Sequence, residues 1–261
     1  MKENEKVTVL MAEYNTKENE LRASIESILN QTYKNFELLI IDDCSDKKST
    51  EIIESYEDNR INLVHNEKNL GLAESLNKGI NLINTKYIIR MDTDDIAKKD
   101  RIEKQINFAS KHQEYSIVAG NANYFNENGI FRTTKIFGEK KKEDFIKGTP
   151  FIHPTMLIKT KDIKAIGGYP NCRRGQDYAM AMEMYSNGYK GYVMKDILID
   201  YRMNTAGYKK KKFKYRLLEF KVRWHYFNKL GIKKHFYIYC LKPILVGLIP
   251  KRILQNYHNK F

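Results

Sequence analysis

Three aspartates within four positions form the densest group of potential ligands in the chain: Asp92, Asp94 and Asp95. They follow an apolar stretch, residues 87–91, that predicts a buried strand. Carboxylates two positions apart at a strand end can converge on one cation, and hard oxygen ligands suit magnesium or manganese. The alternative is a solvated turn or the N-cap of the next helix, both of which aspartate suits.

Three other aspartates, at two places in the chain, could also carry chemistry. Asp42 and Asp43 end the apolar stretch 36–41, and acidic groups at a strand end can accept hydrogen bonds from a ribose or a base N–H. Asp177 follows a polar loop and could act as a general base that deprotonates an attacking hydroxyl. The alternatives are a turn-forming pair for Asp42 and Asp43, and an N-cap for Asp177.

The elements that must position these groups alternate between strand and helix. Apolar stretches predict strands at 7–12, 36–41, 61–65 and 87–91, and helical spacing predicts helices at 18–31, 49–57 and 73–83. This alternation predicts an α/β fold with a mostly parallel central sheet flanked by helices. Because ligands of such sheets gather at the carboxyl ends of the strands, the polar residues after each strand are the candidates for chemistry.

The pattern is more varied after residue 100. We expect a helix at 100–112, strands at 117–137 with a turn at 126–129, a solvated helix face at 140–143, a short strand within 151–170, a helix at 177–187, a strand at 191–201 and a basic helix after 208. The three cysteines, Cys44, Cys172 and Cys240, show no spacing typical of a zinc site or a disulfide framework, which fits a reducing compartment.

The charge of the chain is concentrated near its C-terminus. The formal net charge is +14, and residues 202–261 hold 16 Lys and Arg against the single acid Glu219. The first 201 residues hold 30 basic and 31 acidic residues and are nearly neutral. We expect no secretion signal in the polar start of the chain, and the apolar stretch 236–249 is too short to span a bilayer.

Several motifs in order resemble those of the family 2 glycosyltransferases, which have the GT-A fold. The opening V-T-V-L-M-A-E-Y-N, the segment N-L-G-L-A-E-S-L-N-K-G-I and the acidic R-M-D-T-D-D-I resemble the donor-side motifs. Downstream, H-P-T-M-L-I-K, I-G-G-Y, Q-D-Y-A-M and L-I-D-Y-R-M resemble the acceptor-side motifs. The resemblance runs from about residue 7 to 204, and several motifs in register are more specific than any one of them.

The resemblance implies a role for each matching position. Asp43 would contact the uracil or other base, with Ala12 and Tyr14 lining that pocket. Asp92 and Asp94 would hold a divalent metal, Mn²⁺ or Mg²⁺, and Asp92 and Thr93 would meet the nucleotide diphosphate. Asp95 could share the work of the metal ligands.

The acceptor side carries the expected base and two departures from the family pattern. Asp177 matches the catalytic base, but Gln176 replaces the glutamate that usually precedes it. Ala179 and Met180 stand where the family often has Asp-Leu, which puts acceptor contacts in doubt. His153 could face the acceptor or the pyrophosphate, with a buried structural histidine as the equal alternative.

Two of the motifs contain an arginine: Arg90 begins the acidic motif, and Arg202 lies in the last motif. Arg202 could approach the phosphates. Arg90 is interpreted as structural, pairing a neighbouring carboxylate.

The resemblance implies an inverting enzyme that moves a sugar from a nucleoside-diphosphate sugar, most often a UDP-sugar, to an acceptor hydroxyl in bacterial polysaccharide or glycolipid synthesis. We expect a catalytic domain at 1–204, with the nucleotide-sugar half at about 1–100 and the acceptor half at about 101–204, and a basic helical tail at 205–261. One rival is a sugar-1-phosphate nucleotidyltransferase, but no glycine-rich phosphate loop follows the first strand.

The tail predicts an anionic partner. Lys209 to Lys212 begin a basic, aromatic-rich stretch, and Phe236 to Ile249 could enter a lipid interface with Lys251 and Arg252 at the headgroups. We therefore expect a cytoplasmic enzyme, peripheral on the inner face of the plasma membrane, that meets a glycan or lipid-linked acceptor. Nucleic acid is the less favoured partner, and a merely solubilising tail is a further alternative.

Overall fold

A computed structural model of the chain describes residues 5–172, 174–203 and 213–248. One sheet forms its centre, with the strand order β3-β2-β1-β4-β9-β6-β10-β5, while β7 pairs with β6 and β8 with β10. The strands are β1 (Val7–Glu13), β2 (Phe36–Asp42), β3 (Ile61–His65), β4 (Tyr87–Arg90), β5 (Ile96–Ala97), β6 (Tyr115–Asn126), β7 (Gly129–Thr133), β8 (Gly138–Lys140), β9 (Leu157–Lys159) and β10 (Lys190–Arg202).

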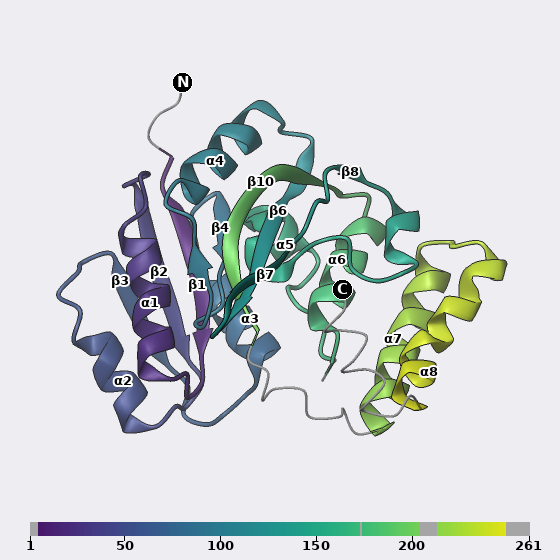
Figure 1. Cartoon of the computed structure of the whole chain (residues 1–261). Coiled ribbons are helices and arrows are strands. Elements are labelled where there is room, and N and C mark those ends of the chain that lie inside the picture. Colours follow the sequence, from purple (N-terminus) through teal and green to yellow (C-terminus); the bar gives the residue numbers. More distant parts are fainter. Residues whose placement is uncertain (1–4, 173, 204–212, 249–261) are drawn as a thin grey trace.

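Helices cover both faces of the sheet, and a helical hairpin extends from one end of it (Figure 1). The α-helices are α1 (Glu18–Leu29), α2 (Lys47–Glu54), α3 (Leu72–Leu82), α4 (Arg101–Lys111), α5 (Thr160–Ala165), α6 (Gln176–Ser186), α7 (Phe213–Lys229) and α8 (Lys242–Leu248). Shorter 3₁₀ helices are η1 (Lys142–Phe145), η2 (His153–Thr155) and η4 (Lys234–Leu241).

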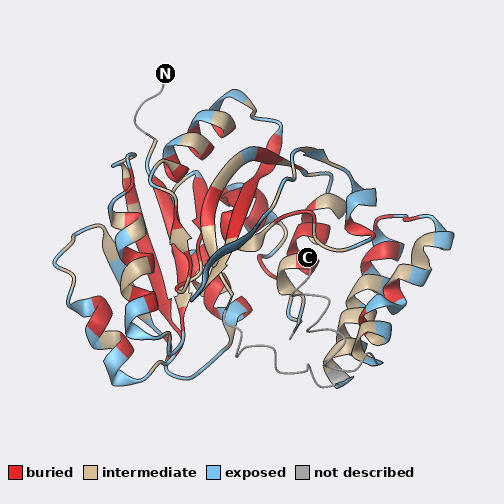
Figure 2. Ribbon diagram, viewed as in Figure 1, coloured by how far each residue is buried: buried red, intermediate tan, exposed pale blue. Residues whose placement is uncertain are grey.

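The first four strands all run in the same direction. β1 pairs in parallel with β2 and β4, and β2 pairs in parallel with β3. The first five residues of β1 and the last five of β2 are all buried, because helices cover both faces of the sheet here (Figure 2). The carboxyl ends of these strands therefore meet along one edge, which lies at the bottom of Figure 1.

The strand direction changes beyond β4. β9 is antiparallel to both β4 and β6, β10 is parallel to β6, and β5 is antiparallel to β10. Along the main path of the described sheet, β9 and β5 thus oppose the direction of the other six strands. The predicted α/β fold with a mostly parallel central sheet flanked by helices is confirmed.

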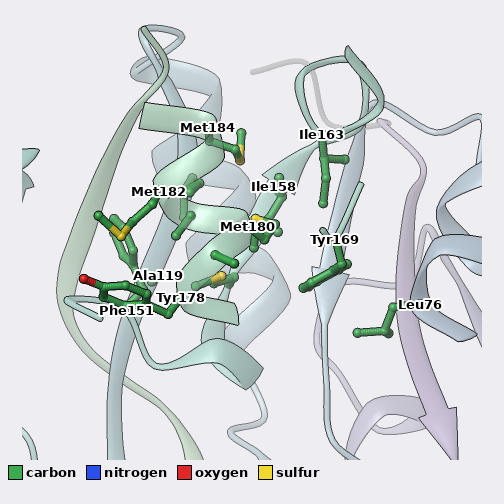
Figure 3. Packing of buried hydrophobic residues seen from close by; sticks show 14 of the residues in the cluster. Leu76, Ala119, Phe151, Ile158, Ile163, Tyr169, Tyr178, Met180, Met182 and Met184 are labelled. Carbon is green, nitrogen blue, oxygen red and sulfur yellow. The ribbon is translucent and has the colours of Figure 1, made fainter. Parts of the chain in front are cut away.

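Two apolar clusters hold the helices against the sheet. One contains residues of α1, α2 and α4, and the other contains residues of α3, α5, α6 and α7. α3 lies so close to β1 that a Cβ atom on Gly79 would come within 2.4 Å of a Leu10 methyl carbon. On α6, Met180, Met182 and Met184 pack into the second cluster (Figure 3). This packing fixes α6, which carries Asp177 in its first turn.

Two local expectations were wrong. The stretch 140–143 was expected to form a helix face, but Lys140 ends β8 and a single 3₁₀ turn begins at Lys142. The helix α5 was not predicted, because its six residues, T-K-D-I-K-A, are too few to show helical periodicity.

The C-terminal hairpin of α7, η4 and α8 packs on the catalytic part of the chain. Tyr226 and Phe227 of α7 are buried in the same cluster as Tyr178 of α6, and the Arg223 guanidinium lies 4.8 Å from the centre of the Tyr178 ring. Part of the basic C-terminal segment therefore packs against α6. The predicted boundary at residue 204 lies outside the described residues and stays a prediction.

The hairpin helices are short. Within the described ranges, no helix is both long and apolar enough to cross a bilayer. The basic residues Lys209 to Lys212, Lys251 and Arg252, which the sequence assigns to membrane contact, lie outside the described residues.

Candidate active site

The turn after β4 brings three carboxylates together. One oxygen from each of Asp92, Asp94 and Asp95 lies within 4.8 Å of the others. The turn is tight because β5, which follows it at once, pairs with the end of β10. Asp92 and Asp94 stay partly exposed, and Asp95 is buried. The predicted metal ligands therefore share one place at the carboxyl edge of the sheet.

Crowding of like charges changes the acidity of this acidic turn. Burial and the Asp92 charge raise the pKa of Asp94 to about 6. Burial, followed by the charges of Asp92 and Asp94, raises the pKa of Asp95 well above its usual range. The Oδ2 atom of Asp95 is buried without a hydrogen-bond partner among the described residues. A divalent cation would relieve both the repulsion and the unsatisfied oxygen, so this set of donors fits one.

Two buried arginines lie beneath the acidic turn. Arg90, the last residue of β4, is 2% exposed and forms an ion pair with Asp92, as predicted. Arg101, at the start of α4, is fully buried and donates from Nη2 to the Arg90 carbonyl oxygen at 2.7 Å. Burial lowers the pKa of Arg101 to about 9, which leaves it charged at neutral pH. Their charges offset part of the negative charge and hold Asp92 in place.

Arg202, at the end of β10, braces the acidic turn from the other side. Its backbone N–H donates to Asp95 Oδ1 at 2.8 Å, and its Nε donates to the Asp94 carbonyl oxygen, also at 2.8 Å. The guanidinium stacks over the Phe125 ring at 4.6 Å. Its approach to the phosphates stays a prediction, although it lies beside the carboxylates that would meet them.

The loop and helix that follow β1 are hydrogen-bonded to the same turn. The hydroxyls of Thr16 and Thr93 lie 2.8 Å apart, and the Ser24 hydroxyl donates to the Asp92 carbonyl oxygen at 2.9 Å. Tyr14 is 53% exposed and Ala12 is partly buried, so both can border a ligand at this edge. Thr16 and Ser24 were not singled out from the sequence, because single hydroxyl residues form no distinctive pattern.

Asp43 organises the loop before α3. Its Oδ1 accepts hydrogen bonds from Asn66 Nδ2 at 2.9 Å and from the Leu70 N–H at 2.7 Å, and its Oδ2 accepts one from the Gly71 N–H at 2.8 Å. Gly71 has a φ of 87°, a conformation that favours glycine. The sequence motif N-L-G therefore serves to wrap the backbone around a buried carboxylate. Asn66 was missed, because its side chain comes from outside that motif.

A histidine–tyrosine pair lies in the part of the chain that is predicted to bind the acceptor. His153 Nε2 lies 2.7 Å from the Tyr169 hydroxyl, and Asn77 holds the Tyr169 backbone through its N–H and its carbonyl oxygen. Burial and the Arg90 charge hold the pKa of His153 well below its usual range, so the ring is neutral at pH 7. Tyr169 lies in the I-G-G-Y motif, but the sequence did not show its link to His153.

Asp177 lies in the first turn of α6, directly after Gln176. Gly175, with a φ of 70°, turns the chain into this helix. Asp177 is partly exposed. Burial is the main cause that raises the pKa of both Tyr169 and Cys172, and the Asp177 charge raises both further. For Tyr169, the Arg90 charge opposes this rise. Asp92 acts on Tyr169 in the same sense as Asp177. The predicted base and the acidic turn therefore both act on this one tyrosine.

The sequence and the fold have counterparts among known proteins. The chain is 32% identical to the putative glycosyltransferase EpsE of Bacillus subtilis, over 98% of this chain and 94% of that protein. It is 30% identical to an Escherichia coli UDP-Gal:alpha-D-GlcNAc-diphosphoundecaprenol beta-1,3-galactosyltransferase, over 94% of this chain and 92% of that protein.

A solved structure shares the fold over nearly the whole chain. The mannosyltransferase PcManGT of Pyrobaculum calidifontis, in complex with GDP-Man and Mn²⁺, superimposes with a TM-score of 0.65 at 17% identity, over 94% of this chain and 69% of that one. Residues 8–167 match the family described as glycosyl transferase family 2. The matched range includes both the acidic turn and His153, and the chain therefore belongs to glycosyl transferase family 2.

Proposed function

We propose that this family 2 glycosyltransferase is an inverting enzyme that transfers a sugar from a UDP-sugar to an acceptor hydroxyl. The observation that carries the proposal is the acidic turn. Asp92, Asp94 and Asp95 meet at the carboxyl edge of the sheet, where repulsion and burial raise the pKa of Asp94 to about 6. Such an arrangement is costly for a protein without a cation, and it suits one that binds a diphosphate through a metal.

Asp92 and Asp94 would hold Mn²⁺ or Mg²⁺, with Asp95 as a further oxygen ligand. When bound, such an ion supplies Lewis-acid stabilisation of a departing diphosphate. Arg90 holds Asp92, and the Arg202 backbone holds Asp95, so the ligands keep their places. The Mn²⁺ and GDP-Man found together in PcManGT support this assignment.

Ala12, Tyr14, Asp43 and Thr93 would bind the nucleotide. A carboxylate has about four lone-pair positions. The three hydrogen bonds that Asp43 accepts from its loop leave one position for a base N–H. The exposed ring of Tyr14 is available to stack on the base.

Asp177 would act as the general base. It would take the proton of the acceptor hydroxyl while that oxygen bonds to the anomeric carbon and the bond to the diphosphate oxygen breaks on the opposite face. No covalent enzyme intermediate is needed, and the configuration at the anomeric carbon inverts. The neutral His153 and the Tyr169 hydroxyl form a hydrogen-bonded pair near the base, and they would orient the acceptor.

The acceptor would be a lipid-linked glycan of bacterial polysaccharide or glycolipid synthesis. The E. coli relative is named for transfer to a diphosphoundecaprenol-linked sugar, and it covers nearly the same length as this chain. An enzyme with such an acceptor would work from the cytoplasm, peripherally on the inner face of the plasma membrane. The excess of basic residues after position 201 supports an anionic membrane partner.

A donor screen tests this function. Purified protein is incubated with a panel of UDP- and GDP-sugars and an undecaprenyl-diphosphate-linked acceptor, with Mn²⁺ or with excess chelator. We expect release of a nucleoside diphosphate from one donor with the ion, and none with the chelator. Release of pyrophosphate, or turnover that the chelator leaves unchanged, would overturn the proposal. Glu51→Gln, an exposed change on α2, serves as a control that keeps full activity.

A further inference from the structure

The C-terminal hairpin exposes an unusual amount of apolar surface. Fourteen large apolar side chains are exposed among the described residues, and seven of them belong to residues 213–248. We call these seven the hairpin stripes. They are Phe213, Leu217 and Trp224 on α7, and Ile238, Leu241, Leu245 and Leu248 on η4 and α8.

The spacing of the hairpin stripes places each set on one helix face. Residues 213, 217 and 224 follow intervals of four and seven, and residues 238, 241, 245 and 248 follow intervals of three, four and three. A different face of each helix already packs inward, through Tyr226 and Leu230 on α7, Cys240 on η4 and Pro243 on α8. Trp224 also packs edge-on against Tyr237 of η4, with the ring centres 4.9 Å apart. Within the described residues, the hairpin stripes are therefore a second apolar face that stays exposed.

The charges beside the hairpin stripes indicate an anionic partner. Residues 213–248 contain eight Lys and Arg and one acid, Glu219, which pairs with Arg216. Lys221, Lys234 and Lys242 are exposed. An apolar face bordered by basic side chains fits the interface of an anionic bilayer, where the apolar residues reach the acyl chains and the lysines stay at the headgroups.

The hairpin is also placed well for such a partner. The start of α7 and the end of α8 lie toward the same side of the molecule as the carboxyl ends of β1 and β2 (Figure 1). A bilayer that receives Leu245 and Leu248 would thus lie near the edge that carries the acidic turn. A lipid-linked acceptor could then reach that edge without leaving the membrane.

We propose that the hairpin stripes insert into the interfacial layer of an anionic membrane, so that apolar insertion, and not charge alone, anchors the enzyme. The link to the acceptor rests on the proposed function, whereas the insertion itself does not. Interfacial helices enter the headgroup and acyl boundary by roughly 5–10 Å.

Trp224 is the only tryptophan of the chain and reports on insertion directly. The full chain is mixed with vesicles of phosphatidylglycerol and phosphatidylcholine, with and without bromine atoms on the acyl chains. We expect its emission to shift to shorter wavelength and to be quenched by the brominated lipid. Binding without quenching would show adsorption by charge alone and would overturn the proposal.

Paired substitutions test the face itself. Leu245→Asn with Leu248→Asn should lower vesicle affinity at least about tenfold, because each leucine loses its apolar transfer free energy. The matched control, Leu82→Asn with Ile130→Asn, removes two equally exposed apolar side chains elsewhere and should bind as the wild type does. Equal loss in both variants would overturn the proposal. So would a wild type that dimerises through this face in sedimentation, with the Leu245–Leu248 variant monomeric.

Activity separates this inference from the proposed function. The Leu245–Leu248 variant should keep wild-type turnover on a short-chain, water-soluble acceptor and lose it on an acceptor in vesicles. If the wild type inserts but transfers no sugar to either acceptor, the insertion stands and the proposed function fails. If the variant loses vesicle binding but keeps turnover on the vesicle acceptor, the proposed purpose of the insertion fails.

Discussion

The nucleotide side and the acceptor side of the candidate site are built in different ways. On the nucleotide side, the carboxylates are held by polar contacts: Asp43 by Asn66 and the Gly71 N–H, Asp92 by Arg90, and Asp95 by the Arg202 N–H. On the acceptor side, His153 and Tyr169 hold each other, and the helix with Asp177 is fixed by apolar packing and by Arg223 of the hairpin.

This difference indicates how the two sides can vary. Loss of a partner of Asp43 or Asp95 leaves a buried carboxylate without its hydrogen bonds, which is strongly destabilising. A change on the acceptor side alters packing around methionines, which adapt to new shapes. We therefore expect the nucleotide side to tolerate fewer substitutions than the acceptor side.

The largest effect is expected from Asp94→Asn. Loss of one charged ligand removes several kcal/mol of stabilisation from the leaving group, so turnover should fall by about a thousandfold or more. The fold should survive, because Asp94 is partly exposed at a strand end. Nucleoside diphosphate release measures the effect. Full activity in this variant would show that the acidic turn takes no part in the reaction.

Asp177→Asn should break the acceptor side alone. Loss of a general base typically costs roughly 100- to 10,000-fold in rate, while binding of UDP and Mn²⁺ should stay unchanged. Turnover and calorimetric titration with UDP measure the two properties. If UDP binding is lost together with turnover, the two sides are not separable in the way described above.

Tyr169→Phe should have a smaller effect on the same side. It leaves His153 Nε2 without its partner, which costs about 1–3 kcal/mol of unfolding free energy. The KM for the acceptor should rise and the KM for the donor should not. Tyr33→Phe, which removes a hydroxyl hydrogen bond far from the site, is the control for stability. A higher donor KM would contradict the division.

The smallest effect concerns the stability of the metal-free protein. The pKa of Asp94 is about 6 in the folded protein, against an ordinary value of 3.8, so the folded state favours the protonated carboxyl. Protonated Asp94 therefore stabilises the fold at low pH, and this stabilisation is lost as the pH rises through about 6. Without metal, Asp94→Asn should therefore be about 1–2 kcal/mol more stable than wild type at pH 7.5. At pH 4.5, which lies between the two pKa values, the difference should be smaller, and it should disappear only below about pH 3.8. Urea unfolding in chelator measures both, and an equal difference at the two pH values would refute the cause given.

The sequence predicted the nucleotide side more fully than the acceptor side. β1, β2 and β4 are largely apolar stretches with acids at or just after their ends, so these strands and the position of Asp92 could be inferred from local pattern alone. The His153–Tyr169 pair depends on contacts between segments that no periodicity connects. The burial of Arg90 was also beyond the pattern, because an arginine is normally exposed unless a partner draws it inward.

The hairpin also determines where the chain can be shortened. Tyr226, Phe227 and Leu230 belong to the same buried cluster as Tyr178 and Met184, and Lys229 pairs with Glu183 of α6 at 2.5 Å. A protease cut or a stop codon before α7 would uncover an apolar face directly behind the helix that carries Asp177. Shortened forms of this enzyme should therefore aggregate, and trimming should leave that face covered only where it removes no more of the described hairpin than its last fifth, α8.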